Sequence, residues 1–329
     1  MIEIKPVARW SVDAALGGGD ESKNISGIAC AERRGDRWSG LMISDEMRYA
    51  RFVRVHREGR ELELRSTIAL LPRALGREHV EETDAEGVDF DDGRYYVIGS
   101  HGVKKLGGDV QASRYFVYRF RVDPDGGEPD FDHGGDDPPP QVHRTDKLAA
   151  VIAATPPLDG FMRRSLQENG VNIEGLAVRG GQLHAGFRSP VLDGQGFILR
   201  VAVADLFGDA PAESVARRVF AVRLRERCGV RDLAKVKGGF LVLTGQAPPA
   251  LQGRAEHEPA EIYWWDGADG ATVLLGRLGG RAPGAKPEAL LVLDENSSTY
   301  RVLVLSDGLA GGAPTEYIVP ARRTRSPPA

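Results

Sequence analysis

The chain has 329 residues, of which 41 are glycine and 41% are hydrophobic, and its formal net charge is −4. A chain of this length can bury a large core without disulfide or metal staples. Its slightly acidic balance argues against nucleic acids and anionic membranes as partners, because both attract surfaces rich in Lys and Arg. The N-terminal stretch lacks the apolar run of a secretory signal, and no segment is apolar enough for a membrane-spanning helix. We therefore expect a cytoplasmic, monomeric globular protein.

One short pattern recurs five times along the chain. Each copy places polar and small residues before a β-prone run, at Asn24–Cys30, Asp84–Phe90, Asn172–Val178, Gly229–Lys235 and Pro287–Leu293. Successive copies stand 60, 88, 57 and 57 residues apart, counted between Gly27, Gly87, Gly175, Asp232 and Ala289. A turn and a second apolar run follow each copy, at Trp38–Ile43, Tyr95–Gly99, Leu183–Phe187, Phe240–Leu243 and Tyr300–Leu305. Repeats of consecutive antiparallel strands are typical of β-propeller blades.

The repeats predict an all-β fold, a single β-propeller domain of five blades over residues 1–329. Further strands show alternation of period two, most clearly at Tyr115–Val122. The last repeat lacks a strand, whereas Glu3–Trp10 is a strand without a blade. We therefore expect the N-terminal strand to join the last blade and close the ring.

Residues 123–170 interrupt the repeats and are expected to form an insertion. The first part is acidic and rich in Pro and Gly, which is typical of a solvated loop. Short helices are predicted at Lys147–Ala154 and Phe161–Glu168. A six-bladed ring, with a degenerate blade inside the insertion, is the alternative.

The blade pattern directs many polar residues to one face of the disc. The innermost strand of a blade crosses the disc and the second strand returns, so the start of one and the end of the other share a face. The starts of the first strands contribute Ser26, Glu86, Glu174, Asp232 and Glu288. Arg231 replaces Asp232 in this set if a bulge shifts the register by one residue. The ends of the second strands contribute Asp45, His101, Arg188, Thr244 and Asp307.

Four carboxylates of this face are the predicted metal ligands: Glu86, Glu174, Asp232 and Glu288. Converging carboxylates suit a hard cation such as Ca²⁺, which takes six to eight oxygen ligands. The alternative is architectural, because each acid can instead accept backbone hydrogen bonds or pair with an arginine of the next blade.

Cationic side chains are predicted to surround these carboxylates. Arg188 is the expected clamp for an anionic substrate, since its guanidinium forms bidentate hydrogen bonds. His101 is the expected general acid or substrate donor. Lys104, Asp45 and Asp307 are the expected substrate contacts.

Three stretches resemble a known family: DAEGVDFDDGRYYVIGSHG at 84–102, NGVNIEGLAVRGGQLHAGFRSPVLDG at 169–194 and GVRDLAKVKGGFLVLTG at 229–245. They resemble the bacterial family called domain of unknown function 3616, which has no settled activity. More distantly, the Asp-x-Glu-Gly blade starts are similar to those of propellers called phytase-like or esterase-like. Those proteins resemble calcium-dependent phosphohydrolases, which implies attack of a metal-bound water on a phosphate ester.

Two functions follow from this face of the disc. The first is metal-dependent hydrolysis of phosphate or carboxylic esters. The alternative is a non-catalytic propeller that binds a small anionic ligand or a protein partner there.

Overall fold

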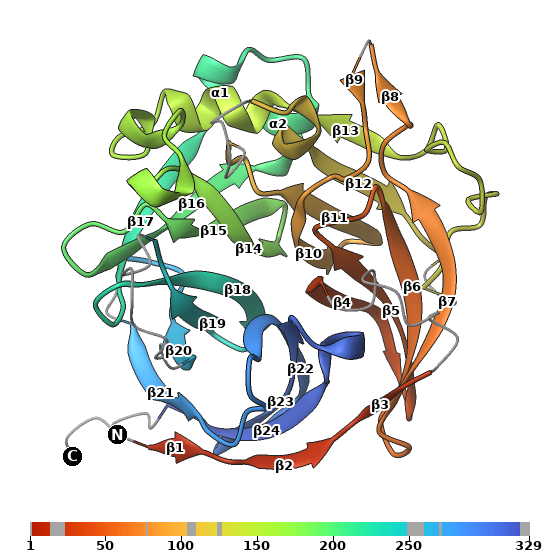
Figure 1. Ribbon diagram of the computed structural model, residues 1–329, viewed down its shortest axis with the longest axis vertical. Coiled ribbons are helices and arrows are strands. Elements are labelled where there is room, and N and C mark those ends of the chain that lie inside the picture. Colours follow the sequence, from red (N-terminus) through yellow and green to blue (C-terminus); the bar gives the residue numbers. More distant parts are fainter. Residues whose placement is uncertain are drawn as a thin grey trace.

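Five sheets of four or five strands stand around a central axis as the blades of a propeller (Figure 1). The computed structural model describes residues 2–13, 24–76, 78–103, 110–123, 127–248, 260–269 and 272–322. The innermost strands of neighbouring blades contact each other all around the ring, including the last with the first. The all-β fold class and the five blades predicted from the repeats are therefore confirmed.

Each blade consists of consecutive antiparallel strands that follow one another from the axis outward. The first blade has β4 (Ile25–Arg34), β5 (Arg37–Ser44), β6 (Tyr49–His56) and β7 (Glu61–Ala69). The second has β10 (Ala85–Asp91), β11 (Arg94–Gly99), β12 (Val117–Arg121) and β13 (His143–Thr145). The third has β14 (Asn172–Arg179), β15 (Gln182–Ser189), β16 (Gln195–Ala202) and β17 (Arg217–Arg223).

The last two blades are built in the same way. The fourth has β18 (Cys228–Val236), β19 (Gly239–Gln246), β20 (Glu261–Trp265) and β21 (Val273–Leu278). The fifth has β22 (Lys286–Glu295), β23 (Thr299–Asp307) and β24 (Thr315–Pro320). A separate small hairpin pairs β8 (Ala74–Leu75) with β9 (Glu78–His79).

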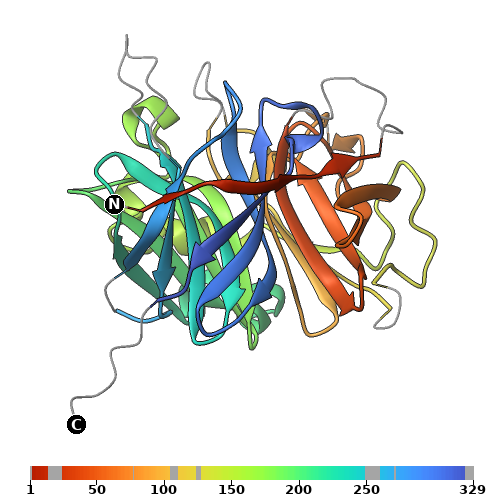
Figure 2. The ribbon, with the colours of Figure 1, turned by 90° about the horizontal axis from the view of Figure 1, so that it is seen from below.

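The N-terminal residues run as a belt across three blades (Figure 2). β1 (Glu3–Ile4) adds a parallel strand to the fourth blade, next to β21. β2 (Pro6–Arg9) pairs with β24 and completes the fifth blade. β3 (Ser11–Val12) adds a parallel strand to the first blade, next to β7. The belt therefore links the last blade to the first through backbone hydrogen bonds.

The insertion contains one of the two helices predicted from its sequence. α1 (Lys147–Ala153) begins where Thr145 Oγ1 accepts a hydrogen bond from the Lys147 N–H, at 3.2 Å. The second prediction is wrong, because the chain there forms two separate 3-10 turns, η3 (Asp159–Phe161) and η4 (Leu166–Glu168). Ser165 starts the second turn, since its N–H and hydroxyl both donate to the Glu168 carboxylate.

The remaining helices are short and lie between strands. They are η2 (Ala112–Tyr115), α2 (Val203–Phe207), η5 (Ala212–Ser214) and η6 (Ala310–Gly312). Because η2 occupies the start of the stretch predicted as a strand at Tyr115–Val122, β12 begins only at Val117. In the described part of the chain, no helix is long and apolar enough to cross a membrane.

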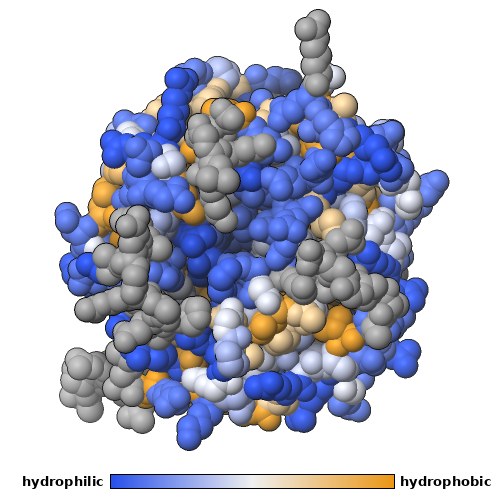
Figure 3. Space-filling model, in the orientation of Figure 1, coloured by the Kyte–Doolittle hydropathy of each residue, from blue (hydrophilic) through white to orange (hydrophobic). Residues whose placement is uncertain are grey.

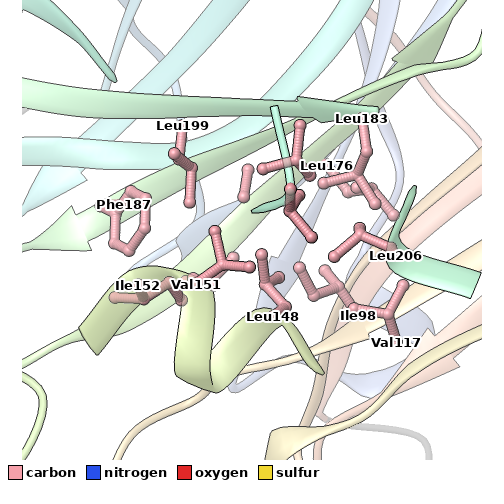
Figure 4. Close-up of a cluster of buried hydrophobic side chains, with 14 of the residues drawn as sticks. Ile98, Val117, Leu148, Val151, Ile152, Leu176, Leu183, Phe187, Leu199 and Leu206 are labelled. Atoms are coloured by element: carbon pink, nitrogen blue, oxygen red, sulfur yellow. The ribbon is translucent and has the colours of Figure 1, made fainter. Parts of the chain in front are cut away.

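α1 covers the core between the second and third blades (Figure 4). Its inner face is formed by Leu148, Val151 and Ile152, all fully buried. This spacing puts the three side chains on one side of a helix. They pack in one cluster with side chains of the two blades, among them Ile98 and Leu176. Burying each such side chain stabilises the fold by about 1.5–3 kcal/mol, so the insertion is part of the domain.

The innermost strands approach each other most closely at glycines that follow the repeat starts. A Cβ added to Gly87 would lie 2.7 Å from the Leu176 Cβ and 3.0 Å from the Leu176 backbone nitrogen. Both atoms belong to β14 of the next blade, which cannot move away without opening the ring. Glycine at this position therefore sets the spacing of the blades around the axis.

We expect Gly87→Ala to destabilise the protein by about 1–3 kcal/mol, the usual cost of overpacking. The free energy of unfolding, measured in urea, tests this. Gly134→Ala is the matched control, because nothing lies within 4 Å of a Cβ added there, and it should change stability by less than about 0.5 kcal/mol. Equal stability of the two variants would contradict the close approach.

Candidate functional site

Each innermost strand carries a β-bulge near its start. In β10, Ala85 pairs with Gly99 and Gly87 pairs with Ile98, so Glu86 between them has no partner in the ladder. The same interruption in the other four innermost strands leaves out Ser26, Glu174, Arg231 and Glu288. A bulge re-aims the side chain of the extra residue. We call these five residues, one from each blade, the axial ring.

The fourth position of the axial ring is Arg231, the alternative that the sequence left open for a bulge, and not Asp232, the predicted metal ligand. The bulge lies between Val230 and Asp232. Asp232 therefore occupies the position that Gly87 holds in the second blade, and Arg231 the position of Glu86. The signal was present in the sequence, because Arg231 precedes Asp232 as Glu86 precedes Gly87.

A chain of ion pairs joins three members of the axial ring. Arg231 Nη1 lies 2.8 Å from Glu174 Oε2 and 2.5 Å from Glu288 Oε1. Arg188 Nη1 approaches the other oxygen of Glu174, at 2.8 Å. Both guanidinium groups also donate to the Gln246 carbonyl oxygen, at 3.3 Å and 3.4 Å. The side chains of Arg231 and Glu174 are only 5% and 4% exposed, so this network is held away from solvent.

Glu86 has a different environment. Its half-buried carboxylate forms no hydrogen bond or ion pair within the described residues. Its neighbours in the ring are Glu174 on one side and the neutral Ser26 on the other, and the charges of Arg114 and Arg231 act on it without forming an ion pair. Burial and then the charges of Glu174, Asp84, Asp45 and Glu288 raise its pKa well above the usual range. Glu86 therefore retains its proton at a pH where an ordinary glutamate is ionised.

Glu288 is also perturbed, although Arg231 pairs with it. Burial raises its pKa to about 8, Arg231 opposes this rise, and Glu174 and Asp307 add to it. One guanidinium is thus shared by two acids, and it does not bring the pKa of Glu288 back to the usual range. The ring holds more carboxylates than cations.

Three further acids surround the ring, and we call Asp45, Asp84 and Asp307 the rim carboxylates. Asp84 pairs with Arg114 at 3.2 Å, and Arg114 also binds Glu82 at 2.6 Å. Asp307 pairs with Lys286 at 2.8 Å. Asp45 and Asp84 both raise the pKa of Glu86. The predicted substrate contacts Asp45 and Asp307 thus lie near the ring, whereas Lys104 lies outside the described residues.

His101 does not join the site, contrary to the prediction of a catalytic role. Its side chain is fully buried, and its ring packs against Tyr115 at 5.7 Å. Nδ1 lies 2.9 Å from the Gly99 carbonyl oxygen. Burial lowers its pKa to about 4, and the charge that acts on it is Asp146. β11 ends at Gly99 and His101 has a φ of 55°, so strand alternation does not direct this side chain.

Asp232 has an architectural role instead. Its two carboxylate oxygens accept hydrogen bonds from the N–H groups of Leu233 and Leu290, both at 2.7 Å. The Leu176 N–H is a further donor. These three groups belong to the fourth, fifth and third blades, so one buried side chain ties three innermost strands together. This is the alternative that the sequence left open for each repeated acid.

At the opposite ends of the innermost strands, a lysine binds groups of two neighbouring blades. Lys235 Nζ lies 2.8 Å from Asp89 and donates to the carbonyl oxygens of Phe90 and Val178, at 2.6 Å and 2.7 Å. The charge is satisfied there within the protein. The less compensated charges therefore lie at the end of the axis that carries the axial ring.

The described residues do not form the ligand set predicted for calcium. A guanidinium stands between Glu174 and Glu288, where a cation would have to bind. In the described ranges, no three His, Cys, Asp or Glu side chains are grouped to hold a metal. What remains is an acidic centre: Figure 3 shows a hydrophilic hollow in the middle of the disc.

We expect Glu86→Gln to be more stable than the unmodified protein, and we expect this difference in stability to grow as the pH rises. Because the folded-state pKa of Glu86 is raised above 4.5, folded protein keeps a proton that unfolded protein has lost, and its stability falls above that pH. Glutamine does not ionise and escapes this loss. Melting temperatures between about pH 5 and about pH 8 test it, with the exposed Glu213→Gln as control. A constant difference across the range would contradict the raised pKa.

We expect Asp232→Ala to lower the free energy of unfolding by at least about 2 kcal/mol, because several buried N–H groups lose their acceptor. Asp232→Asn should lose less, since its amide oxygen still accepts. Urea unfolding of both variants gives the comparison. If Asp232→Ala unfolds like the unmodified protein, the carboxylate does not tie the blades together.

Comparisons with known proteins bear on the fold and the family. The chain is similar to a GH43 β-1,3-galactosidase solved with galactodeoxynojirimycin, with a TM-score of 0.50 and 10% identity over 96% of this chain and 94% of that chain. An exo-β-1,3-galactanase from Phanerochaete chrysosporium aligns with a TM-score of 0.46 and 11% identity, over 96% of this chain and 63% of that one. At such identities the similarity is one of fold.

The sequence comparisons cover less of the chain than the structural ones. No curated protein matches the chain. Two of the three stretches that carried the family resemblance, at 169–194 and 229–245, lie within a single matched region. That region, residues 140–272, matches the model of the family described as "Protein of unknown function (DUF3616)", which confirms the predicted resemblance.

Proposed function

We propose that the axial ring is the active site of a hydrolase that cleaves glycosidic bonds, with Glu86 as the proton donor. The observation that carries this proposal is the contrast between two neighbouring acids. Glu174 is fixed by two arginines, whereas Glu86 forms no ion pair with any described residue, and burial raises its pKa well above the usual range. Acids whose environments differ in this way are suited to different roles in acid–base catalysis.

The charge of the ring favours this chemistry over the hydrolysis of esters. Cleavage of a glycoside passes through an oxocarbenium-like transition state that carries positive charge. Hydrolysis of phosphate or carboxylic esters instead places negative charge on oxygen, which needs unengaged cations or N–H donors. Arg188 and Arg231 are engaged by Glu174 and Glu288. The ring therefore supports developing positive charge better than an oxyanion.

Each residue has a role that its contacts support. Glu86 would donate its proton to the leaving oxygen as the glycosidic C–O bond breaks, as a general acid with a raised pKa does. A water would add to the anomeric carbon and release a proton to the solvent, from which Glu86 regains its own. Glu174, oriented by Arg188 and Arg231, would supply fixed negative charge. The rim carboxylates would accept hydrogen bonds from the hydroxyl groups of an uncharged sugar. A GH43 β-1,3-galactosidase has a similar fold, so a propeller of this kind can house such a reaction.

The test compares chromogenic substrates of three classes: nitrophenyl glycosides, nitrophenyl phosphate and nitrophenyl acetate. We expect the protein to release nitrophenol from at least one glycoside and from neither ester. Glu86→Gln should slow the cleavage of an oligosaccharide with the same sugar by roughly 10²–10⁴-fold, the contribution of a general acid. The nitrophenyl glycoside should be slowed less, because nitrophenolate leaves without protonation.

Glu213→Gln is the control for this series, since that side chain is exposed and remote from the ring. If Glu86→Gln slows the cleavage of the oligosaccharide and of the nitrophenyl glycoside equally, Glu86 is not the proton donor. Turnover of an ester alone would favour the hydrolysis predicted from sequence. If no substrate is cleaved but a sugar or an anion binds, the propeller is a binding protein.

A further inference from the structure

A second cavity lies in the fifth blade, next to the axial ring in sequence and in space. Its volume is about 110 Å³. Pro287 and Ser306, a pair of the β22–β23 ladder, line it. The residues that follow them are Glu288 of the axial ring and Asp307 of the rim carboxylates. Arg9 and Trp10 of the N-terminal belt form part of the wall of the cavity.

The charges of this cavity are opposite to those of the axial ring. Arg9 of the belt and Arg281 of the loop before β22 both line it, and no Asp or Glu is among the described residues that do. Neither arginine forms an ion pair with any residue that the structure describes. Arg281 makes one long hydrogen bond, 3.4 Å to the Ala285 carbonyl oxygen.

Arg281 is held in an unfavourable electrostatic environment. Its side chain is half-buried. Burial lowers its pKa, Tyr317 opposes this, and the neighbouring Arg277 lowers it further. A partly desolvated cation without a counter-charge is costly unless a ligand supplies the charge. Arg231 of the axial ring, by contrast, already has two carboxylate partners.

We propose that this cavity binds a tetrahedral oxyanion, sulfate or phosphate. Two guanidinium groups can form charge-assisted, bidentate hydrogen bonds to its oxygens. The hydroxyl of Ser306 is a further donor at the wall. The volume is ample, because one water needs roughly 10–15 Å³ on the same scale. The small anionic ligand expected from sequence thus finds its counter-charge at Arg9 and Arg281 and not at Arg188.

The test is the melting temperature with increasing sodium sulfate, and separately sodium phosphate, at constant ionic strength. A specific site gives a rise in melting temperature that saturates. We expect Arg9→Ala and Arg281→Ala each to weaken binding by about tenfold or more, the effect of a lost charge-assisted hydrogen bond. Isothermal titration with the same salts measures the dissociation constant directly. A rise with only one of the two salts identifies that anion as the ligand.

Two controls separate this site from general salt effects and from the axial ring. Arg121→Ala removes an exposed arginine of the second blade and should respond like the unmodified protein. Glu86→Gln should bind the anion unchanged, so loss of hydrolysis and loss of anion binding are distinguishable. If Arg281→Ala does not fold, the anion binding of Arg9→Ala and Arg281→Lys tests the proposal instead. A response that never saturates, or one equal in all variants, overturns the proposal, because sulfate then acts only as a general stabiliser.

Discussion

The site depends on one buried guanidinium, that of Arg231. It lies between Glu174 and Glu288 and is almost fully shielded from solvent. Removing such a group would leave two buried acids without a counter-charge, and loss of one partner of a buried pair costs about 3–5 kcal/mol. Its position also determines what the other acids can do. Because the cation pairs with the acids of the third and fifth blades, Glu86 in the second blade has no ion pair with it, and burial raises the pKa of Glu86.

The asymmetry of the ring explains how equivalent positions acquire different chemistry. All five residues occupy the same bulge in the same strand of each blade. The first blade contributes Ser26, whose buried hydroxyl has no hydrogen-bond partner among the described residues. The ring is therefore neutral on one side of Glu86 and acidic on the other. A repeated backbone places the groups, and the side chain at each position decides the charge.

Much of the architecture could be predicted from the repeats, because blade starts and turns leave local patterns of glycine and β-prone residues. The innermost strands fall where the five copies predicted them, and Glu86, Glu174, Glu288 and Arg188 lie together. Two predictions failed where the strand register depends on pairing with another strand and not on the local sequence. Asp232 was assigned to the ring with Arg231 as the alternative, and the bulge puts Arg231 there; His101 was assigned to the face although its strand ends at Gly99. Arg114, which pairs with Asp84, lies in η2, just before the strand predicted at Tyr115–Val122.

The sequence by itself predicted the propeller, favoured five blades over six and indicated the end of the axis that carries the polar groups. These follow from periodicity and turn chemistry, which are properties of short segments. Only the tertiary structure decided which acids are paired, because Arg231 and its partners stand 57 residues apart on either side. The belt joins the last blade to the first, and the innermost strands of these two blades also contact each other. Burial in the closed ring, which no single segment encodes, raises the pKa of Glu86 and leaves Arg281 without an ion pair among the described residues.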